Sequence, residues 1–356
     1  MAIWELTQAC DLVCAHCRAC ATPHRADDEL DTAEGKQLLD SIAAMGTRLV
    51  VLTGGDPAKR ADLVELVRYG SSIGLVMAVT PSGTELTTRS LLEELKAAGL
   101  ARLAVSVDGP GEQVHDKFRG VEGSFAHSVR ILEIARELGL QTQINTSLHP
   151  GNMGDLAAMA AFVGEMGAVL WGVFAVVPTG RATDALSMGA EGLERALEEL
   201  ADLADRAPFD VKTTAAPHFR RILMARHAPR PSLGVLRDVD ADGVVHGPRG
   251  ITDGVGFLFV SHRGEVFPSG FLPVSAGNVR HTDVAAIYRD SALFRDLRDL
   301  GKLGGKCGAC PFKRVCGGSR ARAYALLGDP LAEDPHCAYV PRGYTGRPRV
   351  SLPVVL

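Results

Sequence analysis

Residues 3–17 of the chain read Ile-Trp-Glu-Leu-Thr-Gln-Ala-Cys-Asp-Leu-Val-Cys-Ala-His-Cys. The first part, Ile3–Thr7, favours a β-strand, and Cys10, Cys14 and Cys17 follow it at once. In parallel α/β sheets, functional side chains gather at the carboxyl ends of the strands. We therefore interpret this junction as the end of a first strand that carries a cysteine-bearing functional loop.

The alternation of strand and helix continues outward from this junction. Further β-rich runs occur at Arg48–Thr53, Leu75–Thr80, Arg102–Val107, Gln141–Ser147 and Leu170–Val176. Amphipathic helical stretches lie between the runs, at Glu34–Met45, Ala61–Ile73, Thr88–Ala98, Phe125–Leu138 and Asp155–Met166. Strands alternating with helices imply a parallel sheet with βαβ crossovers. Six such units without a Rossmann glycine fingerprint predict an α/β fold, a partial (β/α)6 barrel of the TIM type.

The remainder of the chain departs from this alternation. We predict a helix at Glu191–Arg206, a strand at Asp210–Thr213 and, from its Pro and Gly content, a long loop at Pro229–Thr252. A hairpin is predicted at Phe257–Phe267, with its turn at His262–Gly264. The predicted domains are a barrel at 1–210, a bridging segment at 211–255 and a small C-terminal domain at 256–356.

The composition limits the classes of partner. The 356 residues are 46% hydrophobic with a formal net charge of −4, which suggests neither a nucleic-acid nor a membrane partner. The N-terminus does not read as a secretory signal, so we expect a cytoplasmic protein. Eight cysteines in a reducing compartment are then expected to bind metal or do chemistry instead of forming disulfides.

The spacing of the first three cysteines is C-x3-C-x2-C. Three thiolates on one short loop can bind three irons of a 4Fe–4S cluster and leave the fourth iron open to a small molecule. A structural zinc site is the alternative, although this spacing is not the usual zinc pairing. Cys20 adds a C-x2-C pair with Cys17 and is interpreted either as a small buried hydrophobic residue or as a catalytic thiol.

The run from Trp4 to Cys17 resembles the signature of the radical S-adenosylmethionine (SAM) superfamily over its full length. The resemblance implies an enzyme that cleaves SAM reductively at a 4Fe–4S cluster bound by Cys10, Cys14 and Cys17. The 5′-deoxyadenosyl radical formed in this way would take hydrogen from the substrate.

Shorter motifs at the other strand ends extend the resemblance. Gly54-Gly55-Asp56-Pro57 follows the second run, where the superfamily usually has Gly-Gly-Glu-Pro, and Thr80-Pro81-Ser82-Gly83 follows the third. Ser106-Val107-Asp108-Gly109 follows the fourth run. By similarity, Ser106 and Arg119 contact the SAM carboxylate or ribose. The predicted cofactor-binding residues are Gly54, Gly55, Asp56, Ser82, Ser106, Asp108, Arg119 and Asn145.

Four further cysteines, Cys307, Cys310, Cys316 and Cys337, crowd the C-terminal part of the chain. They resemble the ligands of auxiliary 4Fe–4S clusters in SPASM and twitch domains, and a zinc ribbon is the alternative. A two-cluster domain usually has further cysteines at the positions of Ser269 and Arg320. The sequence therefore implies one fully ligated auxiliary cluster, suited to electron transfer, and an electron donor such as flavodoxin or ferredoxin.

The substrate is left open between two classes. The stretch 264–280 resembles enzymes of alternative heme and d-type heme synthesis, which act on tetrapyrrole propionates, and also peptide maturases of the mycofactocin and pyrroloquinoline quinone type. His218, Arg220 and Arg221 are candidate contacts for substrate carboxylates, because arginine offers a bidentate fork, or else they begin a solvated helix. An iron–sulfur electron-transfer protein is the alternative from another class, although it would not need the SAM motifs.

Overall fold

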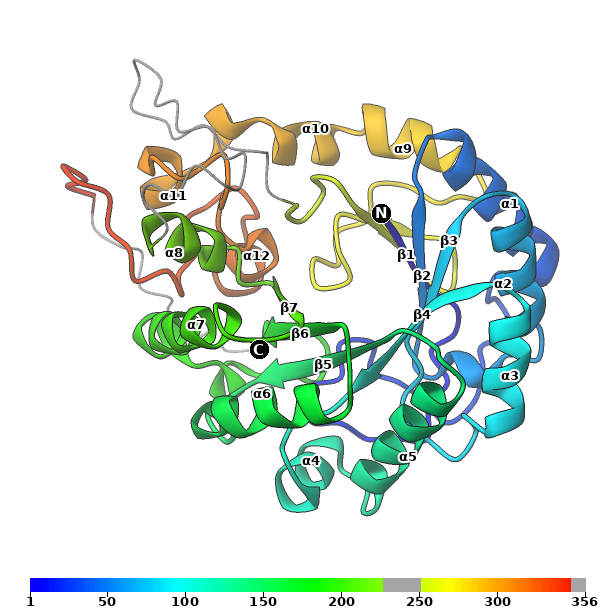
Figure 1. Ribbon diagram of the computed structural model, residues 1–356. Helices are drawn as coiled ribbons and strands as arrows, with labels where there is room; N and C mark the ends of the chain where they lie inside the picture. The colour runs from blue at the N-terminus through cyan, green and yellow to red at the C-terminus, as the bar shows by residue number, and fades with distance from the viewer. Residues whose placement is uncertain (227–250, 347–356) are drawn as a thin grey trace.

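The computed structural model describes residues 1–226 and 251–346. Within these ranges the strands form one nine-stranded sheet in the order β7-β6-β5-β4-β3-β2-β1-β8-β9. The strands are β1 (Ala2–Glu5), β2 (Leu49–Thr53), β3 (Val76–Val79), β4 (Leu100–Ser106), β5 (Thr142–Leu148), β6 (Leu170–Ala175), β7 (Asp210–Thr214), β8 (Leu258–Val260) and β9 (Val266–Phe267). All neighbours pair in parallel except β8 and β9. The predicted α/β partial barrel is confirmed, and Figure 1 shows the open, curved sheet.

Helices connect the parallel strands and cover the outer face of the sheet (Figure 1). They are α1 (Thr32–Ala44), α2 (Leu63–Ser72), α3 (Arg89–Ala97), α4 (Glu112–Arg119), α5 (Ser124–Glu137), α6 (Leu156–Glu165) and α7 (Gly189–Ala204). The predicted helices match all of these except α4, which the sequence analysis missed. That helix is eight residues long, and two of its three buried residues, His115 and Arg119, are polar, so no apolar run marks it in the sequence.

The strands beyond the predicted six units extend the sheet at both edges. Strand β7 (Asp210–Thr214) matches the strand predicted at Asp210–Thr213, crosses the predicted boundary between barrel and bridging segment, and pairs with β6. The predicted hairpin is confirmed as β8 and β9, and β8 pairs with β1 on the other side of the barrel strands. The loop predicted at 229–252 lies almost entirely outside the described residues.

The C-terminal part consists of short helices. They are α8 (His218–Arg226), α9 (Val284–Asp290), α10 (Ala292–Arg298), α11 (Gly305–Ala309) and α12 (Arg320–Leu327). Figure 1 shows α8 beside α11 and α12, and the hydrogen bond from Arg220 Nη1 to the Val315 carbonyl (3.1 Å) ties α8 to this region. Among the described residues, no helix is long and apolar enough to cross a membrane.

The main core lies between the sheet and its outer helices. Trp4 of β1 is fully buried there, and the close packing of its ring leaves no room for a side chain at Gly35 of α1. A Cβ at Gly35 would lie 2.5 Å from the Trp4 ring. The packing of Trp4 against α1 therefore fixes strand β1, which leads into the first cysteine loop, against the outer helices.

We expect Trp4→Ala to lower the free energy of unfolding by about 3–5 kcal/mol, because it leaves a large cavity in this core. Urea unfolding of the purified protein measures the change. Leu86→Ala is the control, since Leu86 is 42% exposed and its truncation should change stability by only ~0.5 kcal/mol. Equal effects of the two substitutions would contradict the assigned core.

Candidate functional site

The first cysteine loop continues from β1 at the carboxyl end of the sheet. Cys10 and Cys14 are buried and pack around Leu12, while Cys17 lies at the edge of the same cluster. The Leu12 amide donates a hydrogen bond to Cys10 Sγ (3.4 Å), and the Ala21 amide donates one to Cys17 Sγ (3.4 Å). The loop thus brings three thiols together and already provides N–H donors to two of their sulfurs.

The Gly54-Gly55 turn holds this loop from the end of β2. The Gly55 amide donates to the Thr7 carbonyl (2.7 Å), and the Asp56 amide donates to the Ala9 carbonyl (2.6 Å). A Cβ at Gly55 would lie 2.3 Å from the Ala9 carbonyl oxygen, so only glycine permits this approach. The turn fixes where the cysteine loop leaves the sheet.

The carboxylate of Asp56 faces inward. It accepts hydrogen bonds from the Thr84 hydroxyl (2.6 Å) and the Ala58 amide (3.1 Å), and burial raises its pKa. Ser82 contacts both sides of the site, because its hydroxyl donates to the Gly55 carbonyl and lies 3.3 Å from Cys10 Sγ. These two predicted residues therefore brace the turn and the cysteine loop.

A buried ion pair approaches the loop from β4 and α4. Arg119 Nε donates to Asp108 Oδ2 (2.7 Å), and Arg119 Nη1 lies 3.9 Å from Cys14 Sγ. Burial alone would raise the pKa of the Asp108 carboxyl, but the Arg119 guanidinium holds it below its usual range. The same carboxylate accepts the Ser147 amide (2.6 Å), which links β4 to β5. The Arg119 guanidinium, whose charge the Asp108 carboxylate balances, is thus held beside Cys14.

Two further predicted residues, Ser106 and Asn145, sit opposite each other on β4 and β5. Asn145 Oδ1 accepts a hydrogen bond from Gln143 Nε2 (2.7 Å), and the Ser106 carbonyl accepts one from the Ser128 hydroxyl (3.3 Å). Ser106 is the last residue of β4, as predicted, whereas Asn145 is the middle residue of β5, so its predicted place at the strand end is wrong. Cys20 is exposed, so its interpretation as a buried hydrophobic residue is wrong, and a catalytic role for its thiol stays a prediction.

The sequence analysis missed an aromatic stack beside the loop. The rings of His16 and Phe118 stack at 4.1 Å, and Phe118 stacks on His149 at 4.0 Å. Burial lowers the pKa of His16 to about 4 and also lowers the pKa of His149, so both rings are neutral near pH 7. Two features of the sequence could have indicated these residues: His16 lies inside the cysteine motif, and His149 directly follows a strand end.

Arg181 was also missed as a site residue. Its amide donates to the Cys17 carbonyl (3.0 Å), and its Nε donates to the Cys14 carbonyl (3.1 Å). A Cβ at the preceding Gly180 would lie 2.4 Å from the carbonyl oxygens of Cys17 and Arg18. The loop after β6 therefore closes the cysteine loop from the side opposite β2.

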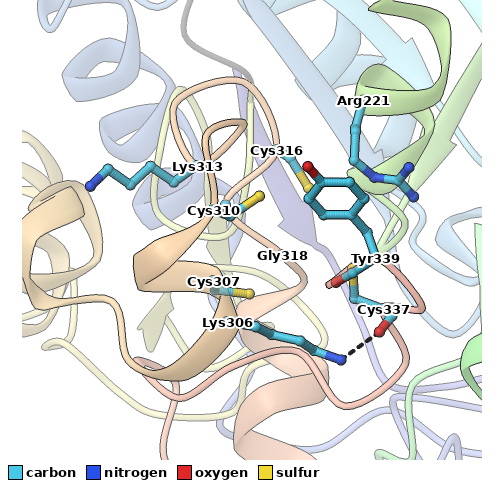
Figure 2. Close-up of a pocket in the computed structure, with 10 residues that line it drawn as sticks. Arg221, Lys306, Cys307, Cys310, Lys313, Cys316, Gly318, Cys337 and Tyr339 are labelled. Atoms are coloured by element: carbon cyan, nitrogen blue, oxygen red, sulfur yellow. Dashed lines mark hydrogen bonds between the residues drawn. The ribbon is translucent and has the colours of Figure 1, made fainter. Parts of the chain in front are cut away.

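The four C-terminal cysteines line a second site. Cys307, Cys310, Cys316 and Cys337 surround a cavity of about 320 Å³, including the part open to solvent. Figure 2 shows this cavity with Tyr339 and Arg221 on one side and the sulfurs of Cys307 and Cys310 on the other. Cys307 lies in α11, Cys310 follows the end of that helix, and Cys337 is held by the bond from Lys306 Nζ to its carbonyl.

The chemistry of the cavity favours a metal group. Burial raises the pKa of all four thiols, that of Cys337 to about 12 and that of Cys316 well above its usual value. Ionised thiols would also repel one another here, so a metal cation must replace their protons if they are to be thiolates. Clustered soft ligands of this kind suit an iron–sulfur cluster or zinc.

The spacing of ligands separates these two metal types. In residues 1–226 and 251–346, no three Cys, His, Asp or Glu side chains converge closely enough to bind one metal ion. A zinc ion holds all its thiolates at about 2.3 Å. Thiolates that bind different irons of a cluster stand farther apart.

The predicted substrate residues lie at the second site. Arg221 lines the cavity, contacts the Tyr339 ring face at 4.9 Å and pairs with Glu194. Arg220 binds the carbonyls of Val315 and Ile251. His218 is buried with its Nε2 3.1 Å from Asp334 Oδ2, an ion-pair distance without good hydrogen-bond alignment. They form part of α8, so the helical interpretation of this segment is confirmed but its solvation is wrong for His218 and Arg221, which are buried.

Comparisons with known proteins agree with this geometry. Residues 4–163 match the sequence profile of the Radical SAM superfamily. The chain is 40% identical over 338 residues to the AdoMet-dependent heme synthase of Methanosarcina barkeri, covering 95% of this chain and 96% of that protein. It is 29% identical over 348 residues to the PqqA peptide cyclase of Rhodopseudomonas palustris, covering 95% and 86%.

A solved structure supports the fold alone. The crystal structure of Streptococcus suis SuiB bound to precursor peptide SuiA superposes with a TM-score of 0.74 at 16% sequence identity. The match covers 95% of this chain and 75% of SuiB.

The Arg119–Asp108 pair yields a test of the site's construction. We expect Arg119→Ala to lower the free energy of unfolding by about 3–5 kcal/mol, because the buried carboxylate loses its partner. The Arg119→Ala/Asp108→Asn double variant should recover part of that loss. Urea unfolding of the parent, both single variants and the double variant measures the coupling, and strictly additive losses would contradict it.

Proposed function

The chain belongs to the radical SAM superfamily, and we propose that it acts in heme synthesis, taking hydrogen from a side chain of a tetrapyrrole precursor. As a member of this superfamily, it is an enzyme that uses SAM together with a 4Fe–4S cluster. The observation that carries the heme-synthesis proposal is the similarity to a heme synthase over nearly the whole of both chains.

We assign the SAM-binding cluster to Cys10, Cys14 and Cys17. Bound there, the reduced cluster and SAM supply a 5′-deoxyadenosyl radical that takes hydrogen from an unactivated carbon. The protein's own part is to hold the loop through Gly55 and to place the Arg119 cation beside Cys14. The stacked rings next to the loop are uncharged, and Phe118 and His149 are buried, so they help to exclude water from a reactive radical.

The residues predicted to contact SAM fall into two groups, according to whether their side chains already accept several hydrogen bonds from the protein. Ser106 ends β4, Asn145 lies opposite it on β5 and Arg119 stands beside the loop, so these three can contact SAM directly. The side chains of Asp56 and Asp108 already accept several hydrogen bonds from the protein. We therefore assign these two carboxylates to positioning the turn and Arg119, with SAM approached by backbone groups of Gly54 and Gly55.

The second cluster belongs to the same proposal. Four cysteines around one cavity would ligate every iron of a 4Fe–4S cluster, which leaves no open iron for substrate and suits electron transfer. A small electron carrier such as flavodoxin or ferredoxin would deliver electrons to the enzyme in the cytoplasm. Contact of substrate carboxylates with Arg220 or Arg221 stays a prediction, and the described bonds weigh against it because both guanidinium groups already bind protein atoms.

Modification of a precursor peptide is the second candidate function. The similarity to a peptide cyclase favours it, but at lower identity than the heme synthase. Membership of an enzyme family argues against a simple electron-transfer protein. Anaerobic assays with SAM, a reductant and one candidate substrate at a time separate the two enzyme functions. We expect 5′-deoxyadenosine to form when a propionate-bearing iron porphyrin is added. Its formation only with a peptide would overturn the proposal.

We expect anaerobic reconstitution to yield about eight irons per chain, four at each cysteine group. Iron and sulfide analysis of the parent, of Cys10→Ala/Cys14→Ala/Cys17→Ala and of Cys307→Ala/Cys310→Ala measures this. Each multiple variant should keep about half of the iron. A parent that saturates at half this content, or that binds only zinc, would contradict the two-cluster assignment.

The two cysteine groups should also differ in function. We expect Cys14→Ala to abolish formation of 5′-deoxyadenosine, whereas Cys310→Ala should retain some formation but yield no tetrapyrrole product. The reason is that only the first group leaves an iron open to SAM. Liquid chromatography with mass detection follows both products, and complete loss of 5′-deoxyadenosine in a folded Cys310→Ala protein that keeps its first cluster would refute the division.

A further inference from the structure

We infer that Arg320 is a positioning residue for the second cluster, which it holds through Cys307 and whose reduction potential it raises. This inference rests on the proposed assignment of that cluster to the four C-terminal cysteines. Arg320 begins α12, only four residues after Cys316, and is 2% exposed. Its guanidinium Nη2 lies 3.5 Å from Cys307 Sγ, within hydrogen-bonding distance for sulfur.

The remaining donors of Arg320 fix the direction of the guanidinium group. Nε donates to the Gly318 carbonyl (3.3 Å), and Nη1 donates to the carbonyls of Pro330 (3.0 Å) and Ala332. These three acceptors are backbone atoms from both sides of α12. The side chain is therefore held rigidly with one edge against the cysteine sulfur.

The charge of Arg320 has no carboxylate partner among the described residues. Arg322, two residues later, pairs with Asp334 at 3.1 Å. The nearby carboxylate of Asp253 accepts the backbone amides of Arg320 and Ala321, both at 3.0 Å, and does not form an ion pair with the guanidinium. Buried charges in proteins are normally paired. A thiolate at Cys307, bound to a cluster of net negative charge, supplies the missing counter-charge.

Gly318 makes this contact possible. A Cβ at this position would lie 2.4 Å from Arg320 Nη2 and 2.9 Å from Cys307 Sγ. Its φ of +71° also disfavours any side chain. The absence of a side chain at Gly318 thus leaves room for the guanidinium to approach the sulfur. The contact between Arg320 and Cys307 therefore depends on a glycine at this position.

The electrostatic consequence has a definite sign. Hydrogen bonds to ligand sulfurs and nearby charge set the potential of an iron–sulfur cluster. A cation beside Cys307 stabilises the reduced form more than the oxidised form, because reduction adds negative charge. In a two-cluster domain the position of Arg320 usually carries another cysteine. In this chain the arginine at that position instead raises the reduction potential of the single auxiliary cluster.

The test uses the full chain carrying Cys10→Ala/Cys14→Ala/Cys17→Ala, so that only the second cluster contributes. The midpoint potential is measured by redox titration with electron paramagnetic resonance. We expect Arg320→Gln to shift it to a more negative value, by at least tenfold in the reduction equilibrium, or about 59 mV for one electron. Gly318→Ala keeps every charge but displaces the guanidinium, and it should shift the potential in the same direction.

Arg314→Gln is the matched control, because Arg314 is exposed in the same cysteine loop and water screens its charge. An unchanged potential in Arg320→Gln, or an equal shift in Arg314→Gln, would overturn the inference. If Arg320→Gln loses the cluster, Arg320→Met, which is also neutral and of similar length, is titrated instead; a potential equal to the parent's would then exclude tuning by the guanidinium. A background protein without iron would refute the cluster assignment itself, which is a separate result.

Discussion

The close approach of the Gly54-Gly55 turn to the first cysteine loop is the constraint on which the site depends. The parallel pairing of β1 with β2 continues beyond both strands as bonds from the Gly55 and Asp56 amides to the loop. Any side chain at Gly55 would push that loop away from the sheet. Because the loop follows β1 directly, the position of three cysteines is set by backbone contacts and not by the cysteines themselves.

The surrounding elements act on the same loop. The Ala15 amide donates to the Phe118 carbonyl (3.0 Å) at the end of α4, and Arg181 binds the loop carbonyls after β6. Strand ends that are far apart in the sequence thus converge on one short segment. Backbone bonds from several elements therefore pre-organise the segment that carries the three thiols.

Much of this architecture was predictable from the sequence, and the failures have physical reasons. Periodicity located the barrel strands and most helices because they bury one apolar face. Helix α4 is short, and two of its three buried residues, His115 and Arg119, are polar. Cysteine spacing located both sites. The carboxylates that pair with His218 and Arg221 lie at Asp334 and Glu194, and no local pattern reveals such distant partners. The stack of Phe118 between two histidines was missed for the same reason.

The two cysteine groups share a design but differ in charge. Each has a buried arginine beside one sulfur, Arg119 at Cys14 and Arg320 at Cys307. The Asp108 carboxylate balances Arg119, whereas Arg320 has no carboxylate partner in the described part of the chain. The surroundings of the second group are therefore more positive by one unit at this contact. The second group also has one more thiolate than the first, so the cation at Arg320 offsets the negative charge of that additional ligand.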